Sequence, residues 1–158
     1  MRTTIILFTL LFAFESVGMA QSADVTNKDY NLARSGLALD GYDPVSYFRA
    51  GEAVEGKKDI VATHHGVSYR FTSKQNQEAF LAQPEKYEPQ YGGWCAYAMG
   101  AEGEKVEVDP GTFKIIDGKL YLFYNKFFNN TLESWNKDEP RLKANADKNW
   151  SKIIQRKD

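Results

Sequence analysis

Cys95 is the only cysteine in the 158-residue chain, and a thiol is the side chain best suited to nucleophilic or soft-metal chemistry. It follows two glycines in the stretch QYGGWCAYAMG, residues 90–100. The composition of WCAYAM favours a short helix with Cys95 in its first turn. Unpaired N–H groups and the positive end of the helix dipole favour a thiolate there. A single thiol is buried and inert, paired between chains, or chemically used.

Three other side chains could join Cys95 as metal ligands. His64 and His65 are the only histidines in the sequence, and imidazole binds copper, zinc or nickel. On a strand these two neighbours point to opposite faces, so one of them at most meets a given partner. Met99 lies four residues after Cys95, on the same face of the expected helix, and its thioether would favour Cu(I). Each also has a structural interpretation, as an edge histidine, a solvated turn histidine and a core methionine.

Other candidate groups are weaker. Asp43 precedes Pro44 and is interpreted as a turn former. The acidic loop around residues 102–109 is interpreted as solvated rather than as a site for a hard cation. The sequence contains no G-x-S-x-G, H-E-x-x-H, C-x-x-C, phosphate-loop or dinucleotide motif. No catalytic residue is predicted, and a non-enzyme is favoured over an enzyme.

A hairpin is expected to position the histidines. The stretch DIVATHHGVSYRF, residues 59–71, indicates two short strands with His65-Gly66 as the turn. Residues that face each other across such a turn share one face, here the core side. The predicted pairs are His64 with Val67, Ala62 with Tyr69, and Ile60 with Phe71.

The remaining elements predict an α+β fold of small antiparallel hairpins packed with short helices. A helix starts at Thr72-Ser73, with Thr72 and Gln75 as a loose capping box, and ends before Pro84. Asp117-Gly118 indicates a second hairpin within residues 113–124. Residues 125–158 read as a helical C-terminus.

The first twenty residues resemble a secretory signal peptide. Arg2 precedes an apolar run over residues 5–14, and small residues lead to cleavage after Ala20, with cleavage after Ala23 as the alternative. We therefore expect a periplasmic or secreted protein with an N-terminal arm (21–36), a single domain (37–158) and no membrane span after signal removal. The net charge of −1 gives no electrostatic case for nucleic-acid binding.

The sequence resembles the YHS domain family, in particular its small exported members, some of which are selenoproteins. The resemblance covers most of the expected mature chain. It implies a treble-clef-like α+β domain linked to heavy-metal handling. The segments that carry it are GYDPVSYF (41–48), HGVSYRFTS (65–73), FLAQPEKY (80–87) and YGGWCAY (91–97).

The chain departs from the YHS pattern at two positions where that family has cysteines. Ser46 follows Asp-Pro-Val, and Thr72 follows Tyr-x-Phe, so the usual thiolate ligands are absent. Cys95 stands where some relatives place selenocysteine, which implies redox or soft-metal chemistry.

These observations predict an exported YHS-domain protein that binds a transition metal ion. Copper is preferred, with zinc or nickel as alternatives, and the expected ligands are Cys95 and His64 with support from His65 or Met99. The partner is the metal ion, with a homodimer or a metal-transport protein as a further partner. The alternatives are a thiol-redox protein that uses Cys95 and a non-catalytic structural or partner-binding module.

Overall fold

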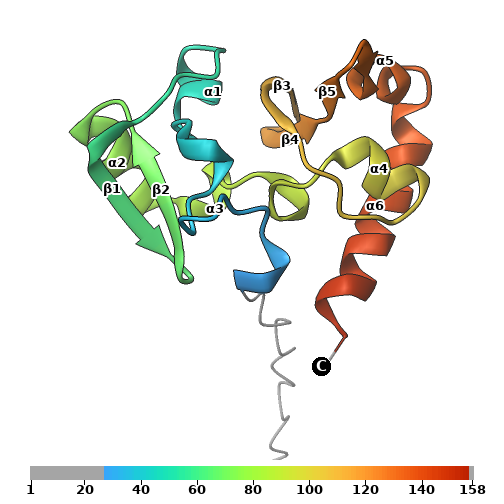
Figure 1. The fold of residues 1–158 in the computed structure, drawn as a ribbon, viewed down its shortest axis with the longest axis horizontal. Coiled ribbons are helices and arrows are strands. Elements are labelled where there is room, and N and C mark those ends of the chain that lie inside the picture. Colours follow the sequence, from blue (N-terminus) through green and yellow to red (C-terminus); the bar gives the residue numbers. More distant parts are fainter. Residues whose placement is uncertain (1–26, 157–158) are drawn as a thin grey trace, which may run out of the picture.

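The computed structural model describes residues 27–156, so the predicted signal peptide lies outside the described residues. The predicted α+β class is confirmed: three two-stranded antiparallel sheets are combined with short helices and a long C-terminal helix (Figure 1). The helices are α1 (Ser46–Arg49), α2 (Lys74–Ala82), α3 (Pro84–Tyr87), α4 (Ala96–Ala101), α5 (Thr131–Asn136) and α6 (Glu139–Ile154). The strands are β1 (Lys57–His64), β2 (Val67–Phe71), β3 (Asp109–Ile116), β4 (Lys119–Phe123), β5 (Asn125–Lys126) and β6 (Asn129–Asn130).

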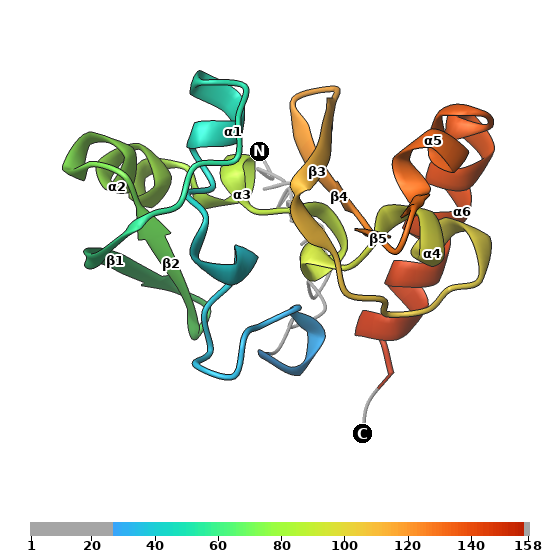
Figure 2. The same cartoon turned by 45° about the horizontal axis from the view of Figure 1, so that its top comes forward.

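Strand β4 lies between the two halves of the molecule. The β1–β2 hairpin and α2 lie on one side, and α4, α5 and α6 lie on the other (Figures 1 and 2). Side chains alternate along a strand, and here both faces of β4 are buried. Leu120 and Leu122 join the apolar cluster under the β1–β2 hairpin, whereas Tyr121 and Phe123 join a second cluster with Trp135. The alternation of one short strand therefore connects the two cores.

The β1–β2 turn forms as predicted. His65 and Gly66 have φ values of +47° and +75°, as a two-residue type I′ turn requires. The predicted pairs His64–Val67 and Ala62–Tyr69 are confirmed. The predicted Ile60–Phe71 pair is wrong, because an irregularity in β1 shifts the register and places Lys57 opposite Phe71. Ile60 and Phe71 are nevertheless both buried.

The second predicted hairpin is confirmed, and a third was not predicted. Asp117 and Gly118 have φ values of +51° and +72° between β3 and β4. Residues 125–130, expected to be helical, instead form the β5–β6 hairpin. Its tip is Phe127-Phe128, at φ values of +52° and +61° and with relative exposures of 89% and 110%.

The start of α2 differs by one residue from the prediction. Ser73 is the N-cap, and its hydroxyl accepts a hydrogen bond from the Asn76 N–H at 3.1 Å. Thr72 does not cap the helix, because its hydroxyl donates to the Asp43 carboxylate at 2.7 Å. The capping box with Gln75 is therefore wrong.

The Asp43 carboxylate is fully buried and ties three segments together. It accepts hydrogen bonds from the Val45 N–H (2.8 Å), from the N–H and hydroxyl of Thr72 (2.8 and 2.7 Å) and from the Asn76 amide (2.7 Å). A buried carboxylate is tolerated only when donors surround it, and here four are present. The turn before α1, the end of β2 and the start of α2 are thereby held at one point.

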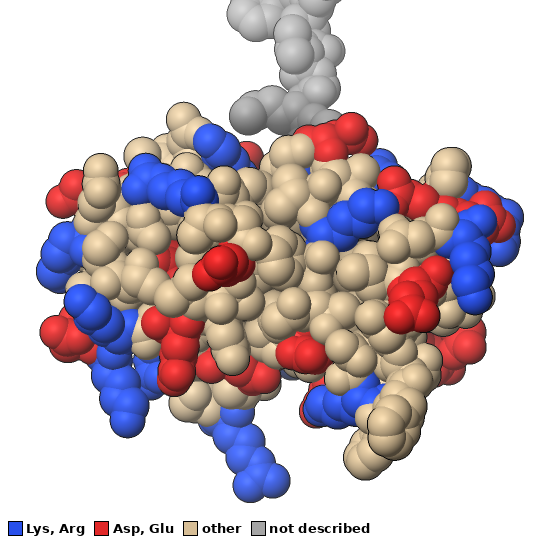
Figure 3. Space-filling view, turned by 90° about the horizontal axis from the view of Figure 1, so that it is seen from above, with Lys and Arg blue, Asp and Glu red and all other residues tan. Residues whose placement is uncertain are grey.

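A membrane span requires a long apolar helix, and a single-sign patch requires charged side chains of one sign gathered on one face. None of the described helices is long and apolar enough to cross a membrane. Basic and acidic side chains are interspersed over the face seen in Figure 3.

We predict that Asp43→Ala lowers the free energy of unfolding by roughly 3–5 kcal/mol, because it leaves buried donors without an acceptor. Urea unfolding of the expected mature chain measures this. Asp59→Ala, an exposed aspartate on β1, is the matched control and should change stability by less than about 0.5 kcal/mol. Equal effects of the two substitutions would show that the Asp43 contacts do not stabilise the fold.

Candidate functional site

Cys95 lies at the end of a tight backbone turn. Tyr91, Gly92 and Gly93 have φ values of +56°, +61° and +84°. Cys95 itself has non-helical angles (φ −58°, ψ 116°) and is the N-cap of α4, with its carbonyl accepting from the Met99 N–H at 3.0 Å. The predicted location in the first helical turn is therefore wrong by one residue.

The side chain of Cys95 is fully buried and has two hydrogen-bond partners. The Tyr124 N–H donates to Sγ at 3.4 Å, and Thr131 Oγ1 lies 3.4 Å from Sγ. Since the Thr131 hydroxyl donates its one proton to the Tyr124 carbonyl at 2.9 Å, the S–H is the donor to Thr131. The thiol is thus satisfied both as a donor and as an acceptor.

Met99 and Cys95 belong to different apolar clusters. The Met99 side chain is fully buried in the cluster with Trp135, whereas Cys95 belongs to the cluster with Leu122. The two residues pack in different clusters although the Met99 N–H bonds the Cys95 carbonyl. Met99 as a metal ligand stays a prediction.

The two histidines lie in the other half of the molecule. His64 and His65 end the β1–β2 hairpin, which both views place apart from α4 (Figures 1 and 2). His65 is exposed in the turn as predicted, and the His64 ring centroid lies 4.0 Å from that of His65 and 6.3 Å from that of Phe80. The buried Nε2 of His64 has no hydrogen-bond partner among residues 27–156. The structure does not bring the histidines to Cys95.

The positions where the YHS resemblance expects cysteines lie together around Asp43. The Ser46 hydroxyl lies 2.7 Å from the Asp43 carbonyl, and the Thr72 hydroxyl bonds the carboxylate of the same residue. Both side chains therefore serve a hydrogen-bonded connection in this chain.

Comparisons with protein-family models, with curated proteins and with solved structures found no match to this chain. Membership of the YHS family stays a prediction. Across residues 27–156, no group of three or more His, Cys, Asp and Glu side chains could hold a metal ion. Metal binding and export therefore also stay predictions.

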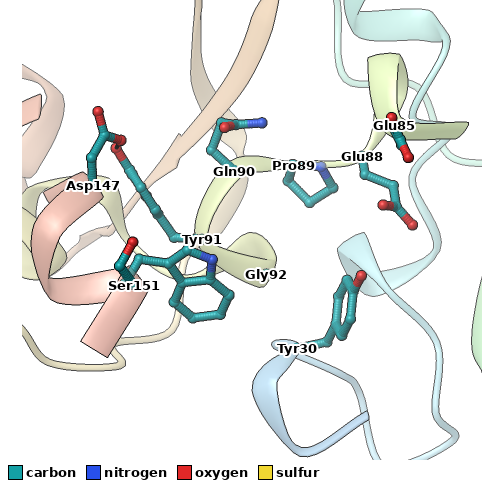
Figure 4. A pocket seen from close by; sticks show the side chains of 10 residues that line it. Tyr30, Glu85, Glu88, Pro89, Gln90, Tyr91, Gly92, Asp147 and Ser151 are labelled. Atoms are coloured by element: carbon teal, nitrogen blue, oxygen red, sulfur yellow. Dashed lines mark hydrogen bonds between the residues drawn. The ribbon is translucent and has the colours of Figure 1, made fainter. Parts of the chain in front are cut away.

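A cavity of about 320 Å³ that was not predicted lies between α3 and α6 (Figure 4). We call it the aromatic–acidic cavity, because three aromatic and three carboxylate side chains contribute to its lining. The lining residues are Tyr30, Glu85, Glu88, Pro89, Gln90, Tyr91, Gly92, Asp147, Trp150 and Ser151.

Gly92 allows the walls of this cavity to approach one another. Its carbonyl accepts from the Asn31 N–H at 2.8 Å, which holds the segment that carries Tyr30. A Cβ at Gly92 would lie 2.6 Å from the Asp29 carbonyl oxygen and 3.0 Å from the Trp150 ring. Only glycine fits this position, because its φ of +61° is also unfavourable for other residues.

Two carboxylates in the cavity are fixed by tyrosine hydroxyls. Tyr91 donates to Asp147 at 2.8 Å, and Tyr69 donates to Glu88 at 3.0 Å. Burial, with the nearby Glu88 and Asp29 carboxylates, raises the pKa of Tyr30 to about 12. Burial and the hydrogen bond to Asp147 also raise the pKa of Tyr91. At neutral pH Tyr30 and Tyr91 are therefore uncharged.

We predict that Cys95 of the native protein resists alkylation, because its sulfur is fully buried and hydrogen-bonded. The rate of reaction with an uncharged maleimide should be at least about 100-fold lower in buffer than in denaturant. The destabilised Asp43→Ala variant should react faster than the wild type in buffer. Rapid alkylation of the native wild type would contradict the buried thiol.

Proposed function

We propose that this chain is a non-catalytic binding protein whose ligand occupies the aromatic–acidic cavity. The observation that carries this proposal is a cavity of about 320 Å³ with three aromatic side chains among its lining residues. This volume is at the lower end of small-molecule sites, which combine apolar walls with a few placed polar groups.

The lining supports recognition rather than bond-making. Neither histidine nor the cysteine lines the cavity, and Ser151 lies exposed on α6. Glu88 and Asp147 are held by tyrosine hydroxyls, and Asp147 also lies 3.5 Å from the Lys143 ammonium. Carboxylates fixed in this way orient a ligand at little cost in conformational entropy.

Figure 4 shows how the walls are arranged. The Tyr91 ring extends toward Asp147. Tyr30 and Trp150 both line the cavity beside Gly92, since a Cβ at Gly92 would lie 3.0 Å from the Trp150 ring and 3.2 Å from the Tyr30 Cα. A flat or compact organic group in the cavity would therefore contact the side chains of both residues.

We predict that a small-fragment panel of cationic, neutral and anionic compounds contains binders that shift the Trp150 indole N–H signal in NMR. Trp150→Leu assigns that signal and should abolish the binding. The indole of Trp135, which is fully buried and donates to Glu139 at 2.9 Å, serves as the internal control. If no compound of the panel moves the Trp150 signal, the proposed function fails.

Copper binding at Cys95 is a second proposal, favoured by one observation. Cys95 lines a separate cavity of about 240 Å³, beside Tyr97, Tyr124 and Thr131. A Cu(I) ion that entered this cavity would find one soft ligand in the sulfur. The described residues supply no imidazole there, since both histidines lie on the distant hairpin.

For this second proposal, we predict one Cu(I) equivalent bound by the wild type and none by Cys95→Ser. His64→Ala should bind as the wild type does, because the β1–β2 hairpin lies apart from α4. Titration against a coloured Cu(I) chelator under reducing conditions measures the three proteins. Equal binding by the wild type and Cys95→Ser would refute metal binding through the thiol.

A further inference from the structure

The charge of the aromatic–acidic cavity has one sign. Glu85, Glu88 and Asp147 line it, and among residues 27–156 no lysine, arginine or histidine does. The nearest cations that the structure pairs with the lining are Lys143, 3.5 Å from Asp147, and Lys105, 6.0 Å from the Trp150 ring centroid. Neither belongs to the lining, and among the described residues no ion pair engages Glu85 or Glu88, so these two carboxylates remain available to a bound cation.

The aromatic rings of the cavity also favour a positively charged ligand. The face of an indole or phenol ring carries partial negative charge and attracts cations within about 6 Å. The Lys105 ammonium lies 6.0 Å from the Trp150 ring centroid, at the outer limit of this range. Tyr30 and Tyr91 keep their protons at neutral pH, so they act as neutral rings rather than as anions.

A bare metal ion does not match this lining. The carboxylates are distributed around an aromatic cavity, and across residues 27–156 no three acidic, histidine or cysteine side chains gather closely enough to hold a metal. A ligand that uses both rings and separated carboxylates must be larger than a metal ion and carry apolar surface beside its charge. An alkylammonium group has both properties.

We propose that the aromatic–acidic cavity binds a small organic cation, of the substituted-ammonium class, between Trp150 and Tyr30. This inference rests on the proposed function and names the ligand class of the same site. The positive group lies against the ring faces, and Glu88 supplies the charge partner. Glu88 is suited to this position because its carboxylate is half-buried and oriented by the Tyr69 hydroxyl.

The test compares choline with 3,3-dimethylbutan-1-ol, its uncharged counterpart of the same shape. NMR titration of the expected mature chain follows the Trp150 indole signal at low and high NaCl. We predict that choline binds at least about tenfold more tightly than the alcohol, because only choline gains the ring and carboxylate attraction. The preference should shrink in high salt.

Two variants locate the effect. Glu88→Gln keeps an acceptor for Tyr69 but removes the charge, so it should weaken choline binding several-fold and leave the alcohol unchanged. Glu133→Gln, an exposed change on α5, is the matched control and should alter neither.

Each outcome decides the inference. Equal affinity for choline and the alcohol overturns the cation class, as does an unchanged choline affinity in Glu88→Gln. In the first case the cavity still binds ligands and the proposed function survives. If neither compound moves the Trp150 signal, the cation inference fails, and the wider fragment panel decides separately whether the cavity binds anything.

Discussion

The buried Asp43 carboxylate is the interaction on which the arrangement of the first half of the molecule depends. It accepts four hydrogen bonds, one from Val45 in its own turn and three from Thr72 and Asn76, which lie 29 and 33 residues later in the sequence. In the YHS pattern, which this sequence resembles, cysteines stand at the positions of Ser46 and Thr72. Here the hydroxyls of both residues bond to Asp43 instead. A carboxylate surrounded by donors can connect chain segments much as a metal ion connects thiolates, and this supports a structural role for these positions.

Strand β4 imposes the second constraint. Because its residues alternate between two cores, Leu122 packs with Cys95 while Tyr121 packs with Met99 and Tyr91. The segment around Cys95 therefore contributes to both cores within a few residues. Its thiol bonds to Thr131 and to the Tyr124 N–H, and its neighbour Tyr91 reaches Asp147 on α6. The same short segment thus supplies a packed sulfur on one side and a cavity wall on the other.

The features that the sequence predicts correctly are those that depend on the types of adjacent residues. His65-Gly66 and Asp117-Gly118 have the turn chemistry that their φ values require. Phe127-Phe128 adopts similar positive φ values without glycine or asparagine, so no local pattern indicates that turn. The shift that separates Ile60 from Phe71 is likewise a tertiary effect. The aromatic–acidic cavity joins Tyr30, Glu88 and Trp150, which no spacing rule connects, so only the fold could reveal it.

The glycine pair before Cys95 has a different role in the structure from the one that the sequence indicated. From the sequence, these glycines indicated a special environment for the thiol. In the structure, a side chain at Gly92 would collide with the Asp29 carbonyl and with Trp150, and its own carbonyl holds Asn31. The positive φ of Gly92 therefore brings the Tyr30 segment and α6 close enough to form two walls of one cavity. Glycine at position 92 therefore allows the aromatic side chains of the cavity to approach one another. The Cys95 sulfur is hydrogen-bonded separately, by the Tyr124 N–H and the Thr131 hydroxyl.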